Sequence, residues 1–180
     1  MAVPLTREAA TELSLAPSLG PSALFVTPTL ATADGIERRA CSRALEWWRE
    51  LAAPRLFPSF ARVTPESASF LWDSLFMIEI ADEPSHYKFV HAGPILRAAL
   101  GADPTGRKVA DALPRAICDR QLYFQKAAVD LRNPVDEAGR WTRTDGDEVL
   151  YRSVFLPLSD DQRRINYLLG AFSFRMVNLH

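Results

Sequence analysis

The carboxylates between residues 145 and 161 are the side chains whose spacing comes closest to a catalytic or metal-binding arrangement. Asp145, Asp147 and Glu148 lie close together, and Asp160 and Asp161 form a second acidic pair. A calcium loop needs its oxygen ligands in a fixed twelve-residue register, which these residues lack. Asp145 is followed by Gly146 between two runs rich in β-branched and aromatic residues, which predicts a tight hairpin turn. The acidic residues are therefore interpreted as turn residues.

Other residues with reactive side chains form no second site. The candidate metal ligands are Cys41, Cys118, His86 and His91. Their spacing matches no zinc pattern, so we predict no metal site. Ser153 and Ser173 lack the glycine elbow of a nucleophilic serine. The stretch Asp103–Arg107 has one glycine and no following Lys-Ser or Lys-Thr, so it is no phosphate loop. Without a catalytic constellation, we expect no enzyme.

The overall composition is that of an ordinary soluble globular protein. The 180 residues are 48% hydrophobic and 24% charged, with a net charge of −1. This charge balance provides no basic surface for nucleic acid. No apolar run reaches the roughly 20 residues of a membrane span, and the N-terminus lacks a secretory signal pattern. We interpret Cys41 and Cys118 as reduced thiols, with a disulfide as the less favoured alternative, and expect a cytoplasmic protein.

The N-terminal segment 1–33 differs in composition from the rest of the chain. It is rich in Ala, Pro, Ser and Thr, and four of its residues are prolines, which interrupt any long helix. We predict a disordered arm, and a cloned start upstream of the true domain is the alternative. Asp34 and Glu37 have the spacing of a capping box. We therefore expect a flanking segment over 34–60 that contains a helix from Glu37 to Ala53.

This predicted helix is amphipathic. The residues on its apolar stripe are Ala40, Ala44, Trp47, Trp48 and Leu51. We favour packing over a stacking platform for bases or sugars as the role of the paired tryptophans, because both belong to this stripe. The stripe either covers the chain's own sheet or packs on a second copy. We predict a homodimer with these five residues at its interface, in which Trp48 serves the fold and Trp47 the partner.

The remainder, 61–180, alternates between strand and helix patterns. Strands are predicted at Ser74–Ile80 and His86–Ala92 as a hairpin. Helices follow at Pro94–Leu100, with Gly101 as its C-terminal cap, at Val109–Leu113 and at Arg115–Leu131. Three further strands are expected around Arg140–Thr144, Glu148–Leu158 and Ile165–Phe174. The plan is an α+β fold, a five-stranded antiparallel sheet with a helical insert after the second strand.

These segments resemble a PAS domain. The passages that carry the resemblance are Phe89–Gly101, Asp103–Arg107, Asp111–Pro114, Leu150–Asp161 and Asn166–Phe174. More narrowly, Trp47 and Trp48 followed by Leu75–Ile78 resemble the bacterial stand-alone PAS proteins of the type-five branch. The resemblance covers about Leu45 to Arg175. It implies a sensory or regulatory module that binds a small ligand, a signalling partner protein, or both. The alternative is a ligand-free dimerisation or adaptor module.

The resemblance also implies a ligand site between the inner face of the sheet and the helical insert. A small apolar metabolite would contact Phe76, Ile78, Phe89, His91, Leu96, Phe124, Val154 and Phe172. For His91 we favour a structural hydrogen bond over a ligand contact. The long helix has no histidine to ligate haem. The surroundings of Cys118 do not match the Asn-Cys-Arg-Phe passage of photoactive flavin domains. The cofactor is therefore left unknown.

Overall fold

A computed structural model describes residues 38–177, so the predicted arm over 1–33 and the capping box at Asp34 and Glu37 lie outside the described residues. The helices are α1 (Arg38–Ala52), α2 (Pro94–Leu100), α3 (Val109–Ala112) and α4 (Arg115–Leu131). The strands are β1 (Leu75–Glu79), β2 (Lys88–Ala92), β3 (Val135–Thr142), β4 (Glu148–Leu158) and β5 (Tyr167–Val177). The element order is the one that the sequence predicts.

The five strands form one antiparallel sheet in the order β2-β1-β5-β4-β3. Both predicted hairpin units are present, since β1 pairs with β2, and β3, β4 and β5 form a meander. The first and last strands lie side by side in the centre of the sheet, where β1 pairs with β5. The predicted fold class, an α+β fold with a five-stranded antiparallel sheet, a helical insert and an N-terminal helix, is confirmed.

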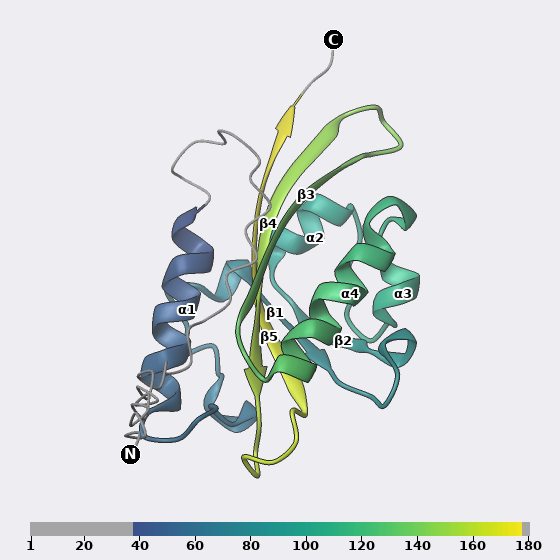
Figure 1. The fold of residues 1–180 in the computed structure, drawn as a ribbon. Coiled ribbons are helices and arrows are strands. Elements are labelled where there is room, and N and C mark those ends of the chain that lie inside the picture. The colour runs from purple at the N-terminus through teal and green to yellow at the C-terminus, as the bar shows by residue number, and fades with distance from the viewer. Residues whose placement is uncertain (1–37, 178–180) are drawn as a thin grey trace, which may run out of the picture.

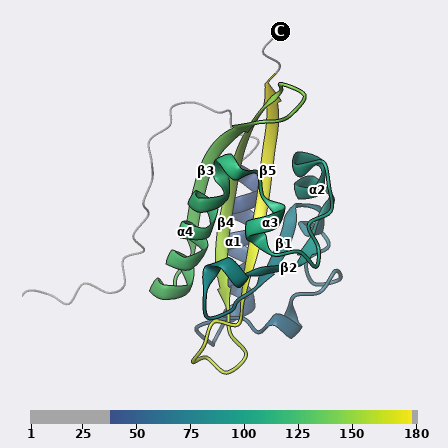
Figure 2. The ribbon, with the colours of Figure 1, turned by 90° about the vertical axis from the view of Figure 1, so that its right-hand side faces the viewer.

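Helices cover both faces of this sheet (Figures 1 and 2). Helix α1 lies on one face, against β4 and β5, while α2, α3 and α4 lie on the opposite face. Consecutive residues of β4 and β5 are buried along much of each strand, as expected for a sheet covered on two sides. We call the face under α2–α4 the inner face and the face under α1 the outer face.

Local sequence signals explain several boundaries. Gly146 has φ of 94°, and the Arg143 amide donates to the Asp147 carbonyl across the predicted turn. Gly101 ends α2 in the left-handed conformation, with φ of 74°, which a glycine adopts without steric cost. Strand β3 begins at Val135, five residues before the predicted start at Arg140. The reason is that β3 pairs with β4 from Val135 onward, with Val135 opposite Phe155. Backbone pairing with β4 therefore extends β3 beyond the apolar residues that predicted the strand.

Candidate functional site

A small cavity lies between the inner face of the sheet and the helical insert. Its walls come from β1, β2, β3 and β5 on one side and from α2, α4 and the residue after α3 on the other. The lining residues are Phe76, Phe89, Leu96, Leu100, Leu113, Ile117, Gln121, Gln125, Trp141 and Phe172. Eight of these ten side chains are apolar, so the site is an apolar chamber with two amide groups in its wall.

The free volume of the cavity is about 10 Å³. This is close to the smallest volume that holds a single water molecule. Aromatic rings account for the tight filling, since Phe76 packs edge-on against Phe89 with ring centroids 6.1 Å apart. A molecule larger than water therefore enters only if these side chains or the helices of the insert move apart.

Four of the eight residues predicted to bind a ligand line this cavity: Phe76, Phe89, Leu96 and Phe172. The other four, Ile78, His91, Phe124 and Val154, are not among its lining residues. Ile78 is fully buried and pairs with Phe89, so it lies on the inner face but beside the cavity. Their expected contact with a ligand remains a prediction.

His91 and Phe89 lie on opposite faces of the sheet, although strand parity predicts that they share one. Ile78 pairs with Phe89, whereas its neighbour Met77 pairs with His91. Two consecutive residues of β1 thus oppose residues that are two apart in β2, which is the signature of a β-bulge. The bulge turns His91 to the outer face, where its ring lies 4.3 Å from that of Trp72. We expected a structural hydrogen bond from the His91 ring, but its buried Nε2 atom has no hydrogen-bond partner among the described residues.

Val154 lies on the outer face because of strand alternation. It pairs with Ala171, while the neighbouring pair of Ser153 and Phe172 lies on the inner face, where Phe172 lines the cavity. Assigning Val154 to the same face as Phe172 was therefore wrong by one residue. Phe124 is half-buried on α4 and packs under the Arg120 guanidinium, 5.3 Å from the ring centroid.

The sequence interpretation missed the two glutamines of the cavity. The buried residues of α4 are Ile117, Cys118, Gln121, Gln125 and Ala128. The apolar residues Phe124 and Leu131 do not belong to this buried face, and Leu131 is exposed. Spacings of four, four and three residues from Ile117 to Gln121, Gln125 and Ala128 give the observed face. That spacing was available in the sequence, but polar side chains are usually placed outside.

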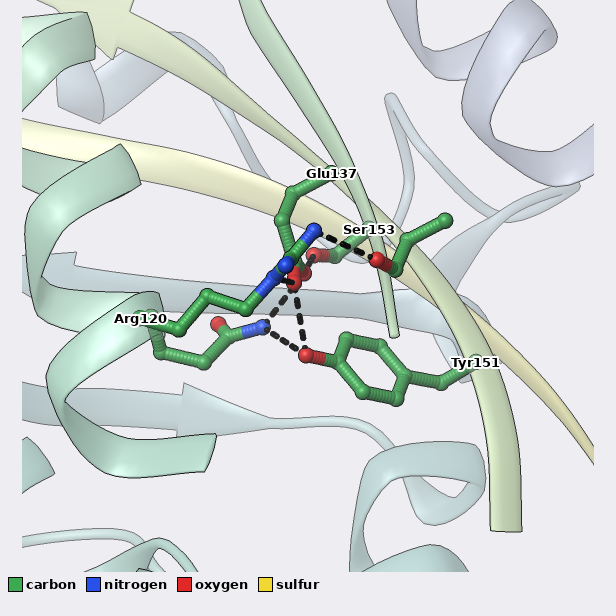
Figure 3. A network of polar contacts seen from close by, with 6 residues as sticks. Arg120, Glu137, Tyr151 and Ser153 are labelled. Carbon is green, nitrogen blue, oxygen red and sulfur yellow. Dashed lines mark hydrogen bonds and ion pairs between the residues drawn. The ribbon is translucent and has the colours of Figure 1, made fainter. Parts of the chain in front are cut away.

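A polar network connects α4 with β3 and β4 beside the cavity (Figure 3). At its centre is Glu137, a carboxylate whose side chain is fully buried. Arg120 Nε and the Tyr151 hydroxyl each donate to Glu137 Oε1 at 2.7 Å. Gln121 Nε2 and the Ser153 hydroxyl donate to Oε2 at 2.7 and 3.3 Å. With four donors, the buried charge is both paired and hydrogen-bonded, which is what an interior carboxylate requires.

A glycine makes room for this network. Gly139 pairs with Tyr151 across β3 and β4, and a Cβ at Gly139 would lie 2.6 Å from the Tyr151 hydroxyl. The phenol ring therefore lies across the glycine and reaches Glu137. Burial, and then the negative charge of Glu137, raises the pKa of Tyr151 above its ordinary value. The phenol consequently stays protonated and donates to the carboxylate at neutral pH.

The remaining reactive side chains do not gather at this site. Cys118 lies on the buried face of α4, and burial, followed by the charges of Asp119 and Asp111, raises the pKa of its thiol. A thiol with a raised pKa is a poor nucleophile at neutral pH. Within residues 38–177 no three His, Cys, Asp or Glu side chains cluster as potential metal ligands. No helix in the described part of the chain is long and apolar enough to cross a membrane.

The five residues predicted for a dimer interface lie on α1. Ala44, Trp47 and Trp48 are buried within this chain, and Ala40 and Leu51 are half-buried. Trp48 Nε1 donates to the Pro157 carbonyl at 2.9 Å and the ring packs edge-on against Phe57. Trp47 packs edge-on against Phe70, which is 48% exposed. The stripe thus covers the chain's own sheet, and its role in a dimer remains a prediction.

No protein-family model matches the chain, and no curated protein matches it in sequence. Among solved structures, it is similar to a light-oxygen-voltage domain studied with a flavin analogue. The identity is 11%, 66% of this chain and 89% of that chain are covered, and the TM-score is 0.49. It is also similar to the light-oxygen-voltage domain of a histidine kinase from Erythrobacter litoralis, with 17% identity, 56% and 94% covered, and a TM-score of 0.42.

A third similar structure is the PAS-B domain of Drosophila melanogaster Cycle with bound ethylene glycol, at 12% identity, 56% and 99% covered, and a TM-score of 0.42. All three likenesses are distant in sequence and below a TM-score of 0.5. What those domains bind is therefore a property of those proteins, and the fold class of this chain follows from its own sheet and helices.

Proposed function

We propose that the chain is a PAS-type sensory or regulatory module that binds a small, mainly apolar molecule between its sheet and α2–α4. The observation that carries this proposal is Gln125. Its side chain lines the cavity and is 1% exposed, yet Oε1 has no hydrogen-bond partner among the described residues. A buried acceptor without a partner costs about 1–3 kcal/mol of stability. A ligand with a donor would remove that cost.

The rest of the wall suits such a ligand. Eight apolar side chains surround the two amides, and binding sites for small molecules generally combine an apolar lining with a few polar groups. Binding requires the cavity to widen beyond its 10 Å³. A widening of this kind would shift α2 and α4 relative to the sheet, and this shift is the signal that we propose a partner protein reads.

A ligand-free dimerisation or adaptor module is the second candidate. The small free volume favours it, because an interior that holds at most one water needs no ligand to complete its packing. In this second candidate, a buried water would satisfy Gln125 Oε1. The two candidates differ in what the folded protein retains when it is purified.

We also propose a homodimer in which the α1 side of the molecule is the interface. Its support is Phe70, whose ring is 48% exposed beside the buried Trp47 and carries the Arg43 guanidinium 5.1 Å above it. Aromatic residues and arginine are the residue types that most often dominate protein interfaces. The bacterial type-five branch is part of the same proposal and rests on the sequence resemblance. A cytoplasmic location is also proposed, and it rests on the interpretation of Cys41 and Cys118 as reduced thiols.

Native mass spectrometry of the protein purified from its own host tests the ligand and the dimer together. A sensory module is expected to retain a small molecule of defined mass, released on unfolding, in the wild-type protein and in a surface variant such as Tyr123→Leu. Gln125→Leu should lose that mass while gaining stability, because the variant no longer buries an unpartnered acceptor. A protein without added mass, whose stability Gln125→Leu leaves unchanged, would support the ligand-free module instead.

A further inference from the structure

We propose that residues 22–27 add a further strand to the sheet by pairing with the outer edge of β3. The binding surface consists of this edge and the neighbouring flank of α4, and its occupant is a segment of the same chain. The inference goes beyond the proposed ligand-binding function and does not depend on it. It replaces the expected disorder of the N-terminal arm for these six residues only.

Strand β3 lies at the edge of the sheet and, among the described residues, pairs only with β4 (Figure 2). The Ala138 carbonyl accepts a hydrogen bond from Arg120 Nη2 at 2.9 Å, so it is turned away from β4. Residues two positions apart in an antiparallel strand turn their backbone groups the same way, so those of Asp136 and Arg140 also point out of the sheet. A carbonyl oxygen accepts two hydrogen bonds, so Arg120 leaves this edge open to another strand.

The flank of α4 beside this edge is partly apolar and partly uncovered. Four residues with spacings of four, three and four share this side of the helix: Arg120, Phe124, Ala127 and Leu131. Arg120 reaches the backbone of β3, so this side of α4 faces the edge strand. Phe124 and Ala127 are half-buried, and Leu131 is 60% exposed. A strand added to β3 would therefore bring every second side chain against this flank.

The segment before α1 contains one run that suits this edge. Residues 23–26 are four consecutive apolar residues, and Phe25 is the only aromatic residue among residues 1–37. Phe, Val and Thr favour strands. Pro21 and Pro28 lie on either side of the run, and proline has no N–H to donate within a sheet, so the strand is limited to residues 22–27.

The two sides of the added strand would meet different surroundings. Asp136 pairs with Val154, which lies on the outer face, so the outer side of the added strand meets charged neighbours. The inner side meets the α4 flank, where Phe124 and Leu131 offer apolar contact. We therefore place Phe25 on the inner side, because an aromatic ring gains most from apolar surroundings.

The position at which α1 begins brings residues 22–27 within reach of this edge. Near the start of α1, Cys41 Sγ donates to the Ala171 carbonyl at 3.7 Å. Ala171 lies opposite Val154, and Val154 opposite Asp136, so α1 begins at about the height of Asp136 along the sheet. The path from there over β4 to the edge is roughly 20 Å, two strand spacings and the thickness of one packed layer. Residues 28–37 span up to about 33 Å when extended, which is sufficient.

Amide hydrogen exchange in the full chain, followed by NMR, tests this pairing. We expect the amides of Asp136 and Arg140 to exchange about tenfold or more slowly in the wild type than in Phe25→Asp, because a carboxylate would not pack on the apolar flank. Leu19→Asp introduces the same charge outside the apolar run and should leave the slow exchange unchanged. The amides of Glu137 and Gly139, which point toward β4, should exchange at equal rates in all three proteins.

A comparison at two protein concentrations that differ tenfold identifies the occupant of the edge. Equal protection of Asp136 and Arg140 at both concentrations supports a segment of the same chain, whereas protection that falls on dilution would assign the edge to a second copy and overturn the inference. Fast exchange of both amides in the wild type would overturn it as well. So would slow exchange that Phe25→Asp leaves unchanged. None of these outcomes bears on the proposed ligand site, which native mass spectrometry tests separately.

Discussion

Arg120 Nε lies 2.7 Å from Glu137 Oε1, although the Glu137 side chain is fully buried and that of Arg120 is 44% exposed. A residue on the surface of α4 therefore neutralises a carboxylate inside the domain. The same guanidinium donates through Nη2 to the Ala138 carbonyl at 2.9 Å and so also binds the backbone of β3. Because β3 is an edge strand, this contact ties the edge of the sheet to the helical insert.

Arg120→Met should lower the free energy of unfolding by about 2 kcal/mol. The substitution keeps the alkyl chain but leaves Glu137 as a buried charge without a counter-ion, and breaking a buried pair costs about 3–5 kcal/mol. The partial exposure of Arg120 reduces this cost. Urea denaturation at pH 7 measures it. Lys126→Met is the matched control, because Lys126 forms an exposed ion pair with Asp130 on the same helix and should cost about 0.5 kcal/mol or less. Equal costs for the two variants would contradict the argument.

Gly170→Ala should destabilise the protein through Phe76. The two residues are paired between β1 and β5, and a Cβ at Gly170 would lie 2.0 Å from Phe76 Cζ. The ring cannot move freely, since it also packs edge-on against Phe89 and Phe155. Overpacking of this kind typically costs about 1–3 kcal/mol.

A double-mutant cycle isolates this contact. Phe76→Leu removes the ring atoms that the new methyl group would meet, so the double variant Gly170→Ala/Phe76→Leu should be more stable than the sum of the single effects predicts. The expected coupling is about 1 kcal/mol or more, as for residues in direct contact. Additive effects in thermal or urea unfolding would show that the glycine is not needed for Phe76 to lie across β5.

The parts of the fold that the sequence predicted well depend on local signals. Asp145-Gly146 and Gly101 marked their turns, and the helix Arg115–Leu131 had the predicted ends. The candidate ligand site was harder to predict from the sequence, because two of its features, the β-bulge at His91 and the polar network around Glu137, depend on tertiary structure. The bulge that turns His91 to the outer face arises from the pairing of β2 with β1, and no local residue pattern predicts it. Glu137 lies outside the strand that the sequence predicted, and its four hydrogen-bond donors come from the distant elements α4 and β4.

His91 should make the stability fall as the solution becomes mildly acidic. Burial, and then the positive charge of Arg97, lowers the pKa of His91 below 6.5, while Asp103 acts in the opposite direction. Above about pH 6.5 the imidazole is neutral in the folded and the unfolded state, so its full contribution to the stability of the folded protein is present. Below that pH the unfolded chain binds the proton first, so stability declines until the pH reaches the lower pKa of the folded state.

Urea unfolding at pH 7.5, 6.5 and 5.5 measures this decline. His91→Phe keeps a ring against Trp72 and removes the buried Nε2 that has no partner in the described chain, so it should flatten the decline without loss of stability at pH 7.5. His86→Gln, at an exposed position, is the control and should leave the decline unchanged. A decline that persists in full in His91→Phe would assign it to another group.

The two adjacent tryptophans of α1 should respond differently to substitution. Trp48→Phe removes the indole N–H that donates to the buried Pro157 carbonyl, and an unpaired buried acceptor costs about 1–3 kcal/mol. Trp47→Phe keeps a ring that can still pack against Phe70, so its cost should be below about 1 kcal/mol. Thermal unfolding of both variants at equal concentration measures the difference. A larger loss for Trp47→Phe would reverse the assignment of Trp48 to the fold.

The proposed homodimer predicts that a substitution on the α1 side changes the oligomeric state, whereas one on the α4 side does not. Phe70, the exposed neighbour of Trp47, should lie in the interface, so Phe70→Ser should reduce the mass measured by light scattering at micromolar concentration from that of two chains to that of one. Its thermal midpoint should change little at concentrations where the wild type is also dissociated, because the ring is half exposed within the chain. Leu131→Ser, at an exposed apolar position on the α4 side, should keep the mass of the dimer. A wild-type mass of one chain, or a loss of dimer in Leu131→Ser but not in Phe70→Ser, would exclude an interface on the α1 side.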